Sequence, residues 1–306
     1  MTPAIPSEPV DVDEVTLRAA ERAIADAIDR RDASDLTVLG FGEIAVAIGW
    51  PTESATVVLK RTVVYRDRAD CERHMSAVAD YVARLVERGV PVIPTTVHVV
   101  ARDDGRYVGY AAQPVVPKAL LAETVLETDE PRADHPLLTA VRDYTVEHVR
   151  PELSVDMQIP NFAWDGERLV LLDITSPIVF TADGELDFVL TPEIFALVPA
   201  PMRRFALREA MRILHIYRSV PETLSFVVSL LYRIDQQRWA PAAAENFAAE
   251  LTKPLDLDAV EAEHRRLVKV LPFIARSSMA ERWWSTKVRR RSYDFFITDS
   301  FNGELL

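Results

Sequence analysis

The stretch that most constrains the fold lies at residues 153–175, with the sequence LSVDMQIPNFAWDGERLVLLDIT. Within it Asp165-Gly166 predicts a tight reversal, because Asp and Gly tolerate the positive φ angles that hairpin turns require. The apolar run after this turn predicts a strand that ends at Asp173. A loop, a short strand, a turn and a second strand would therefore bring Asp156, Asn161 and Asp173 together at one end of a ribbon.

These three residues offer two carboxylates and one carboxamide. Magnesium-assisted phosphoryl transfer uses such a set, with oxygen ligands for a hard cation and one free carboxylate to orient the attacking hydroxyl. The plainer alternative is an ordinary β-hairpin with carboxylates scattered on its surface. The rest of the chain has to decide between the two.

A short glycine segment lies upstream, at Gly40-Phe41-Gly42, between two apolar segments that favour strands. It predicts a strand, a turn and a second strand, in which the glycines would let backbone N–H groups approach phosphate oxygens closely. A plain hairpin turn explains the same residues. In the next predicted strand, residues 56–64, Lys60 interrupts an apolar run and must either point to solvent or meet an anion.

Taken in order, these features resemble the protein-kinase-like superfamily, and especially its aminoglycoside-phosphotransferase and choline-kinase-like branch. The resemblance is carried by D-x4-N from Asp156 to Asn161, by the hairpin, and by the hydrophobic strand that ends in Asp173. Val57-Val58-Leu59-Lys60 also resembles the V-A-I-K sequence of kinase-like proteins. The resemblance implies an α+β, bilobal fold with a five-stranded antiparallel sheet and one main helix in the N-lobe, and a mostly α-helical C-lobe.

The chain divides accordingly into a flexible tail at 1–12, an N-lobe at 13–113 and a helical C-lobe at 114–306 that contains the catalytic loop 153–175. Hydrophobic periodicity supports this division, because it predicts helices and strands in the order of a kinase-like small lobe. The predicted helices lie at 13–30, 67–88 and 136–149, the predicted strands at 56–64, 95–102 and 106–113, and a series of further helices follows residue 202.

The resemblance also implies roles for individual residues. Asp156 would accept the proton of the acceptor hydroxyl or orient it, and Asn161 and Asp173 would hold Mg²⁺ on the phosphates of ATP. The nucleotide would be bound by Gly40, Phe41, Gly42 and Lys60, and at the hinge by Gln113 and Val115. An acid of the helix at 67–88 would pair with Lys60, and the candidates are Asp80 and Glu72, which could equally be solvated helix charges.

Two positions depart from the family pattern. Ser154-Val155 stands where the family has a histidine ahead of the catalytic aspartate, and Asp173-Ile174-Thr175 stands where D-F-G, or D-F or D-x-x, is expected.

Composition excludes several other classes of function. A formal charge of −12 argues against nonspecific binding to nucleic acid or to anionic membranes, both of which need a basic surface. No apolar run approaches the ~20 residues of a membrane span. The single cysteine, Cys71, allows no disulfide framework and favours a reducing cytoplasm. The basic run Lys287–Arg291 fits either a solvated helix end or an anion- or partner-binding patch, and the sequence does not indicate an oligomeric state.

The function expected from the sequence is an ATP-dependent phosphotransferase that acts on a hydroxyl of an unidentified small molecule. One alternative is a nucleotide-binding pseudokinase that serves as a scaffold. Another is a kinase-fold enzyme that transfers a nucleotidyl group. The presence of Lys60, Asp156, Asn161 and Asp173 together argues against a pure scaffold, which has no physical need for all four.

Overall fold

The computed structural model describes residues 3–30, 32–41, 45–187 and 203–266. Gly42 of the predicted glycine turn and the basic run Lys287–Arg291 lie outside the described residues. The same holds for the end of the predicted helical region beyond residue 266.

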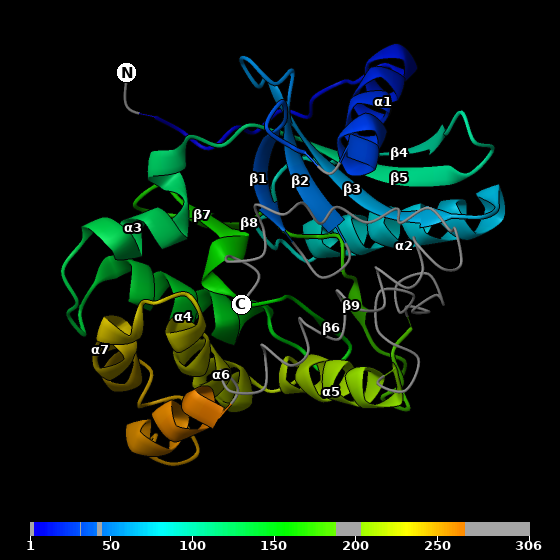
Figure 1. Cartoon of the computed structure of the whole chain (residues 1–306). Helices are drawn as coiled ribbons and strands as arrows, with labels where there is room; N and C mark the ends of the chain where they lie inside the picture. Colours follow the sequence, from blue (N-terminus) through cyan, green and yellow to red (C-terminus); the bar gives the residue numbers. More distant parts are fainter. Residues whose placement is uncertain (1–2, 31, 42–44, 188–202, 267–306) are drawn as a thin grey trace.

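The first part of the chain forms a five-stranded antiparallel sheet in the order β1-β2-β3-β5-β4 (Figure 1). Its strands are β1 (Thr37–Phe41), β2 (Ala45–Trp50), β3 (Val57–Tyr65), β4 (Thr96–Ala101) and β5 (Tyr107–Pro114). β-Branched and aromatic residues dominate these strands, as a pleated and largely buried sheet favours. Gly105, with a φ of +81°, lies in the tight connection between β4 and β5.

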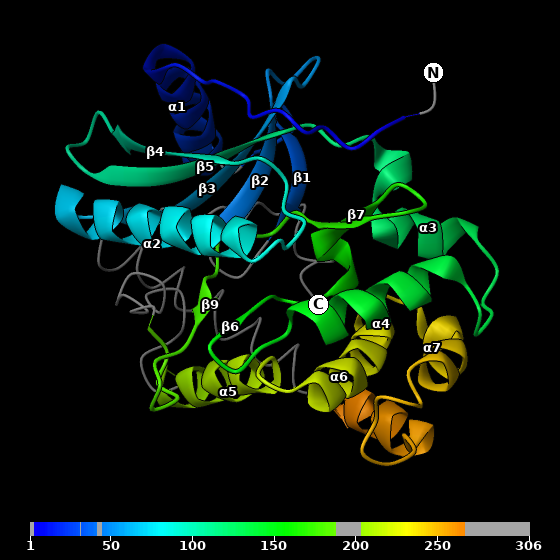
Figure 2. The ribbon, with the colours of Figure 1, turned by 180° about the vertical axis from the view of Figure 1, so that it is seen from behind.

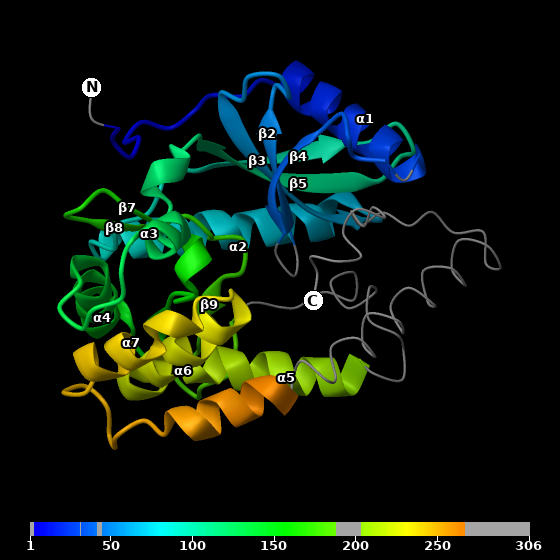
Figure 3. The same ribbon diagram turned by 60° about the vertical axis from the view of Figure 1, so that its left-hand side comes forward.

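Two helices cover opposite faces of this sheet, as Figure 3 shows. α1 (Glu14–Arg30) packs its apolar stripe on the face that carries Val57 and Leu59 of β3. Because side chains alternate along a strand, Val58 and Lys60 lie on the other face, which looks toward α2 (Arg68–Glu87) and the rest of the chain. The alternation in β3 therefore directs Lys60 toward the interior of the molecule.

α2 forms for local reasons that the sequence carries. The side chain of Asp67 accepts a hydrogen bond from the backbone N–H of Asp70 at 2.9 Å and so caps the first turn. Gly89 follows the helix with a φ of +75°, a conformation that glycine adopts without strain. The buried stripe of α2 consists of Cys71, His74, Met75, Val78, Tyr81 and Leu85.

The second part is mostly helical and lies below the sheet, as seen from behind in Figure 2. Its helices are η1 (Lys118–Leu120), α3 (Ala122–Thr128), α4 (Pro136–His148), α5 (Arg203–Ile216), α6 (Val220–Arg233), η5 (Gln237–Trp239) and α7 (Ala240–Asn246), and a helical segment at 257–266 follows. Between α4 and α5 two small ribbons form, β6 (Leu153–Ser154) with β9 (Ile178–Val179), and β7 (Phe162–Trp164) with β8 (Leu169–Leu171).

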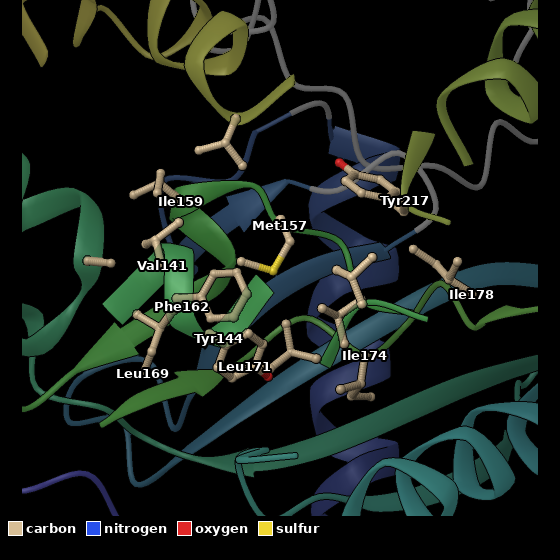
Figure 4. Packing of buried hydrophobic residues seen from close by; sticks show 14 of the residues in the cluster. Val141, Tyr144, Met157, Ile159, Phe162, Leu169, Leu171, Ile174, Ile178 and Tyr217 are labelled. Atoms are coloured by element: carbon tan, nitrogen blue, oxygen red, sulfur yellow. The ribbon is translucent and has the colours of Figure 1, made fainter. Parts of the chain in front are cut away.

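One large hydrophobic core joins α2, the two ribbons and helices α4, α6 and α7. Figure 4 shows part of it, with Val141 and Tyr144 of α4 among residues of the 153–178 stretch. The predicted α+β class is confirmed, with a five-stranded antiparallel sheet ahead of a mostly helical region. The sheet with α1 and α2 lies above the helical part, which agrees with the expected division into two lobes (Figure 2).

Residues 3–12, expected to be a flexible tail, pack against the sheet and the helical part. Ile5 and Val12 are both buried, and the hydroxyl of Thr96 donates to the backbone oxygen of Val10 at 3.3 Å. Sequence reasoning missed these contacts because two apolar residues in a proline-rich segment do not produce a periodic signal. Within the described ranges, no helix has both the length and the apolar character to cross a membrane.

Candidate functional site

The β7–β8 hairpin forms as predicted around Gly166, which has a φ of +99°. The carboxylate of Asp165 accepts hydrogen bonds from the backbone N–H groups of Glu167 and Arg168, at 3.1 and 2.8 Å, and so closes the turn. The ribbon is also attached to the segment after α2, because Ile93 N donates to Leu171 O at 2.9 Å. Strand β8, which ends at Leu171 rather than at the predicted Asp173, is therefore attached to the chain beneath the sheet.

Lys60 meets the segment directly after this strand. Its Nζ donates to the backbone oxygen of Leu172 at 2.8 Å and lies 3.1 Å from Oδ1 of Asp173. The side chains are 11% and 26% exposed, so the pair is largely shielded from water and still reachable from it. The alternative in which Lys60 points to solvent is wrong. The sheet and the ribbon bring together two charges that lie 113 residues apart in the chain.

Asp173 is stabilised as a carboxylate. Oδ1 also accepts hydrogen bonds from the hydroxyl and the backbone N–H of Thr175, at 2.8 and 3.3 Å. Burial alone would raise the pKa of Asp173, but the charge of Lys60 and the hydrogen bonds from Thr175 and Lys60 hold that pKa below its ordinary value. Thr175 thus helps to keep Asp173 ionised.

Asp156 has the opposite character. Oδ1 accepts from the hydroxyl of Tyr217 at 2.5 Å and from the backbone N–H of Gln158 at 3.2 Å, and Oδ2 accepts from the Gln158 amide at 2.8 Å. Burial raises the pKa of Asp156 above its ordinary value, the nearby charge of Asp173 adds to the rise, and the hydrogen bonds only partly oppose it. Two neighbouring carboxylates with pKa values shifted in opposite directions are typical of a catalytic site. In such a site one carboxylate accepts a proton, and the other stays ionised.

Asn161 lies at the end of a short 3₁₀ turn, η2 (Ile159–Asn161), directly before β7. Its Nδ2 contacts the backbone oxygen of Asp156 at 3.4 Å, and its backbone oxygen accepts from Leu172 N at 2.7 Å. Within the described part of the chain, neither Oδ1 of Asn161 nor Oδ2 of Asp173 has a hydrogen-bond partner. No group of three or more His, Cys, Asp or Glu side chains that could hold a metal occurs among those residues.

Of the residues predicted to bind the nucleotide, Gly40 and Gln113 lie, by strand register, on the face of the sheet that carries Lys60. Gly40 belongs to β1, and a side chain added there would meet no atom within 4 Å, so its surroundings are open. Phe41 is the last residue of β1. Gln113 of β5 is buried, and its amide donates to Leu172 O at 2.8 Å and to the Thr95 hydroxyl at 3.0 Å. Val115 follows the end of β5 and is half-buried.

Gln113 therefore ties β5 to the segment that carries Asp173. The carbonyl of Leu172 receives both the Gln113 amide and the Lys60 ammonium group. A side chain predicted only as part of a hinge thus helps to set the position of the neighbouring carboxylate.

Neither predicted helix acid pairs with Lys60, which corrects that prediction. Glu72 lies on the exposed side of α2 and pairs with Arg68 at 2.6 Å, and Asp80 is also exposed. The helical period explains the outcome, because the buried stripe runs through residues 71, 74, 75 and 78 and turns both acids away from the sheet. Lys60 pairs with Asp173 instead.

His74 takes the inward position on α2. Its Nδ1 lies 2.5 Å from the hydroxyl of Tyr65, and its Nε2 lies 3.4 Å from the backbone oxygen of Thr175. Burial lowers the pKa of His74, against a smaller opposing effect of the Thr175 carbonyl, which favours a neutral ring. Tyr81, one to two turns further along, donates to the backbone oxygen of Ser154 at 2.6 Å. α2 therefore contacts the chain on both sides of the site.

Sequence reasoning missed His74, Gln158, Thr175 and Tyr217 as neighbours of the site. His74 could have been found, because it falls on the apolar stripe of its helix and a buried histidine needs partners. Tyr217 could not, since it follows α5 and meets Asp156 across 61 residues of sequence.

Residues 19–283 of the chain match the model of a protein family described as "Family of unknown function (DUF6206)". The chain belongs to this family. No curated protein matches it. Among 43 chains of solved structures that match, one is a MAP kinase from Leishmania major, with 12% sequence identity and a TM-score of 0.32 over 85% of this chain and 100% of that chain. Membership of DUF6206 names no reaction, so the function must be argued from the site.

Proposed function

We propose that this protein is an ATP-dependent phosphotransferase that transfers the γ-phosphoryl group to a hydroxyl of a small molecule. The observation that carries the proposal is the pairing of Lys60 with Asp173, 3.1 Å apart, next to an Asp156 whose pKa is shifted the opposite way. Phosphoryl transfer needs little covalent chemistry from a protein, and these residues supply the positioning and charge that it does need.

Each residue has a role in this proposal. Lys60 neutralises phosphate charge, and Asp156, whose pKa is raised, takes the proton of the acceptor hydroxyl. The donor set fits Mg²⁺, because Asp173 is held ionised and both it and Asn161 have side-chain oxygens without partners within the described ranges. Asn161 and Asp173 would hold the ion, which would offset the negative charge of the phosphates when bound.

The nucleotide would lie between the sheet and the β7–β8 ribbon. The open surroundings of Gly40 suit a close approach of phosphate to the end of β1. The side chain of Gln113 is engaged in internal hydrogen bonds, so adenine recognition at Gln113 and Val115 falls to the backbone. The finer form of this proposal is that the acceptor is a small molecule of the kind on which aminoglycoside phosphotransferases or choline kinases act.

One observation favours a second candidate, a nucleotide-binding pseudokinase that acts as a scaffold. Lys60 is paired with Asp173, and the acids of α2 point away from it. Protein kinases need a lysine–helix glutamate pair in place for activity. Transfer of a nucleotidyl group by the same site is a third possibility, and it differs from the first only in the product.

Nucleotide binding is tested by thermal unfolding with and without Mg·ATP. A ligand at a hundred times its Kd adds about 2.7 kcal/mol to the free energy of unfolding. We expect this stabilisation in the wild type and in Lys253→Ala, an exposed lysine beyond α7, and a clear reduction in Lys60→Ala and Asp173→Ala. Equal stabilisation of Lys60→Ala and the wild type would contradict the nucleotide site.

The reaction is tested by mass spectrometry of a metabolite mixture incubated with the protein and Mg·ATP. A compound that gains one phosphoryl group with the wild type, and not with Asp156→Ala, supports the phosphotransferase. A nucleotidyl gain would favour the third possibility. Binding of Mg·ATP without any modified product would favour the scaffold, and a product that Asp156→Ala still forms would remove Asp156 from its proposed role.

A further inference from the structure

The two oxygens of Asp156 are held in different ways. Oδ1 accepts two hydrogen bonds, from the hydroxyl of Tyr217 at 2.5 Å and from the backbone N–H of Gln158 at 3.2 Å. Oδ2 accepts one, from the side-chain amide of Gln158 at 2.8 Å. A carboxylate oxygen can accept about two hydrogen bonds, so Oδ1 is fully engaged, whereas Oδ2 keeps a position for a further donor.

The donors on Oδ1 cannot easily move. Tyr217 is 1% exposed, and its ring packs edge-on against Phe226 with centroids 5.8 Å apart. Figure 4 shows it within the large core, across from Met157, the neighbour of Asp156 in the chain. The second donor, the N–H of Gln158, belongs to the backbone. Replacing either one would require the core or the loop to rearrange.

The turn that carries Tyr217 is itself anchored. Arg218 Nε donates to the backbone oxygen of Pro151 at 3.0 Å, and the same guanidinium lies 4.8 Å from the centre of the Phe180 ring. Pro151 precedes β6, and Phe180 follows β9. The turn between α5 and α6 is thus attached to both strands of the ribbon that leads into and away from the site, and it holds the Tyr217 hydroxyl at a set place.

The donor on Oδ2 is different. The Gln158 side chain is half-buried, and within the described part of the chain its amide has no other hydrogen-bond partner. Rotation about its side-chain bonds would release Oδ2 without moving the backbone. Oδ2 is therefore the oxygen that an incoming hydroxyl can reach.

We propose that Tyr217 is a positioning residue that fixes Oδ1 of Asp156, and that the acceptor hydroxyl binds to Oδ2, where the Gln158 amide competes with it. This inference rests on the proposed function. As the acceptor oxygen bonds to the γ-phosphorus, the bond from that phosphorus to the β–γ bridging oxygen breaks and ADP leaves. The acceptor's proton passes to Oδ2. Tyr217 keeps the carboxylate oriented and touches no reacting atom.

The test uses hydrolysis of Mg·ATP, in which water is the acceptor. Tyr217→Phe removes a charge-assisted hydrogen bond and should lower kcat roughly tenfold while the KM for Mg·ATP stays unchanged. Gln158→Ala frees Oδ2 and should raise kcat by roughly two- to tenfold. Opposite effects from two donors to one carboxylate are not expected of general damage to the fold.

Tyr144→Phe is the matched control. Tyr144 is also buried, and its hydroxyl donates to the backbone oxygen of Pro91 at 3.3 Å rather than to a carboxylate. It should leave kcat unchanged. The inference is overturned if both site variants change kcat in the same direction, or if Tyr217→Phe raises the KM for Mg·ATP and leaves kcat alone.

Proton exchange measured by NMR gives a readout that needs no turnover. The Tyr217 hydroxyl proton should exchange slowly with water, and the Gln158 side-chain amide should exchange quickly. An amide at Gln158 as protected as those of the core would overturn the inference, whatever the hydrolysis rate. Absence of stabilisation by Mg·ATP would instead contradict the proposed function, so the two failures are distinguishable.

Discussion

The perturbation with the clearest expected size is Glu21→Gln, on the face of the sheet opposite Lys60. Glu21 of α1 is 4% exposed and Arg61 of β3 is 1% exposed. Arg61 donates to the two carboxylate oxygens of Glu21 at 2.7 and 2.9 Å, and Tyr110 donates at 2.5 Å. Arg102 also hydrogen-bonds Glu21. This cluster clamps α1 onto β3, the strand in which Lys60 directly precedes Arg61.

Neutralising Glu21 would leave the guanidinium of Arg61 buried without its counter-charge. Breaking one side of a buried ion pair typically costs about 3–5 kcal/mol, far more than the pair contributes relative to an apolar replacement. We therefore expect Glu21→Gln to lower the free energy of unfolding by about 3–5 kcal/mol at pH 7. Urea denaturation followed by far-UV circular dichroism measures this difference.

The loss should depend on pH in a defined direction. Burial would raise the pKa of Glu21, but the charge of Arg61 and the hydrogen bonds from Arg61 and Tyr110 hold it below the ordinary value. A lowered carboxyl pKa contributes stability that is present above the unfolded-state pKa of about 4.3 and is lost as the pH falls through the folded-state pKa. The difference in the free energy of unfolding between the wild type and Glu21→Gln should therefore become smaller below about pH 4.

Glu14→Gln is the control on the same helix. Glu14 pairs with Arg18 at 2.7 Å, with 69% of its side chain exposed, and exposed pairs contribute about 0–1 kcal/mol. A loss in Glu21→Gln no larger than that of Glu14→Gln, or a gap that stays constant from pH 7 to 3, would refute the reasoning.

Two further outcomes follow from packing. A Cβ at Gly109 would lie 2.2 Å from Sδ of buried Met75, so Gly109→Ala should lower the free energy of unfolding, measured in urea, by about 1–3 kcal/mol. A Cβ at Gly40 meets no atom within 4 Å, so Gly40→Ala should change the free energy of unfolding by less than about 0.5 kcal/mol. Equal losses in the two variants would contradict this. Burial raises the pKa of Cys71 to about 12, so a colorimetric thiol reagent at pH 8 should label Cys71 only after denaturation. Rapid labelling of the native protein would show that the thiol is accessible.

The hairpin of the site could be predicted from sequence because its causes are local. Asp165 and Gly166 close the turn with contacts to residues two and three positions away. The cap of α2 at Asp67 is equally short-range. Turn residues, caps and periodic apolar stripes determine such elements within a few residues of chain, so the α+β class and the order of the strands and helices followed from them.

The charge pairing of the site was decided by tertiary structure alone. The strand pattern allowed Lys60 either to point to solvent or to meet an anion. The fold brings Asp173, 113 residues away in the chain, next to Lys60 and so favours the second arrangement. The helix acids failed as partners because two positions along a helix are about 200° apart around its axis, so His74 faces inward while Glu72 faces water.

The second carboxylate shows the same division. Asp156 and Asn161 stand in one short segment, and their spacing is legible in the sequence. Tyr217, which donates the hydrogen bond that orients Asp156, lies in the turn after α5. No local sequence pattern predicts this contact. The sequence alone therefore determined the elements and the residues able to carry chemistry, because propensities act over a few residues. Only the tertiary structure decided which of those residues meet and how their pKa values shift, because burial and charge pairing depend on segments far apart in the chain.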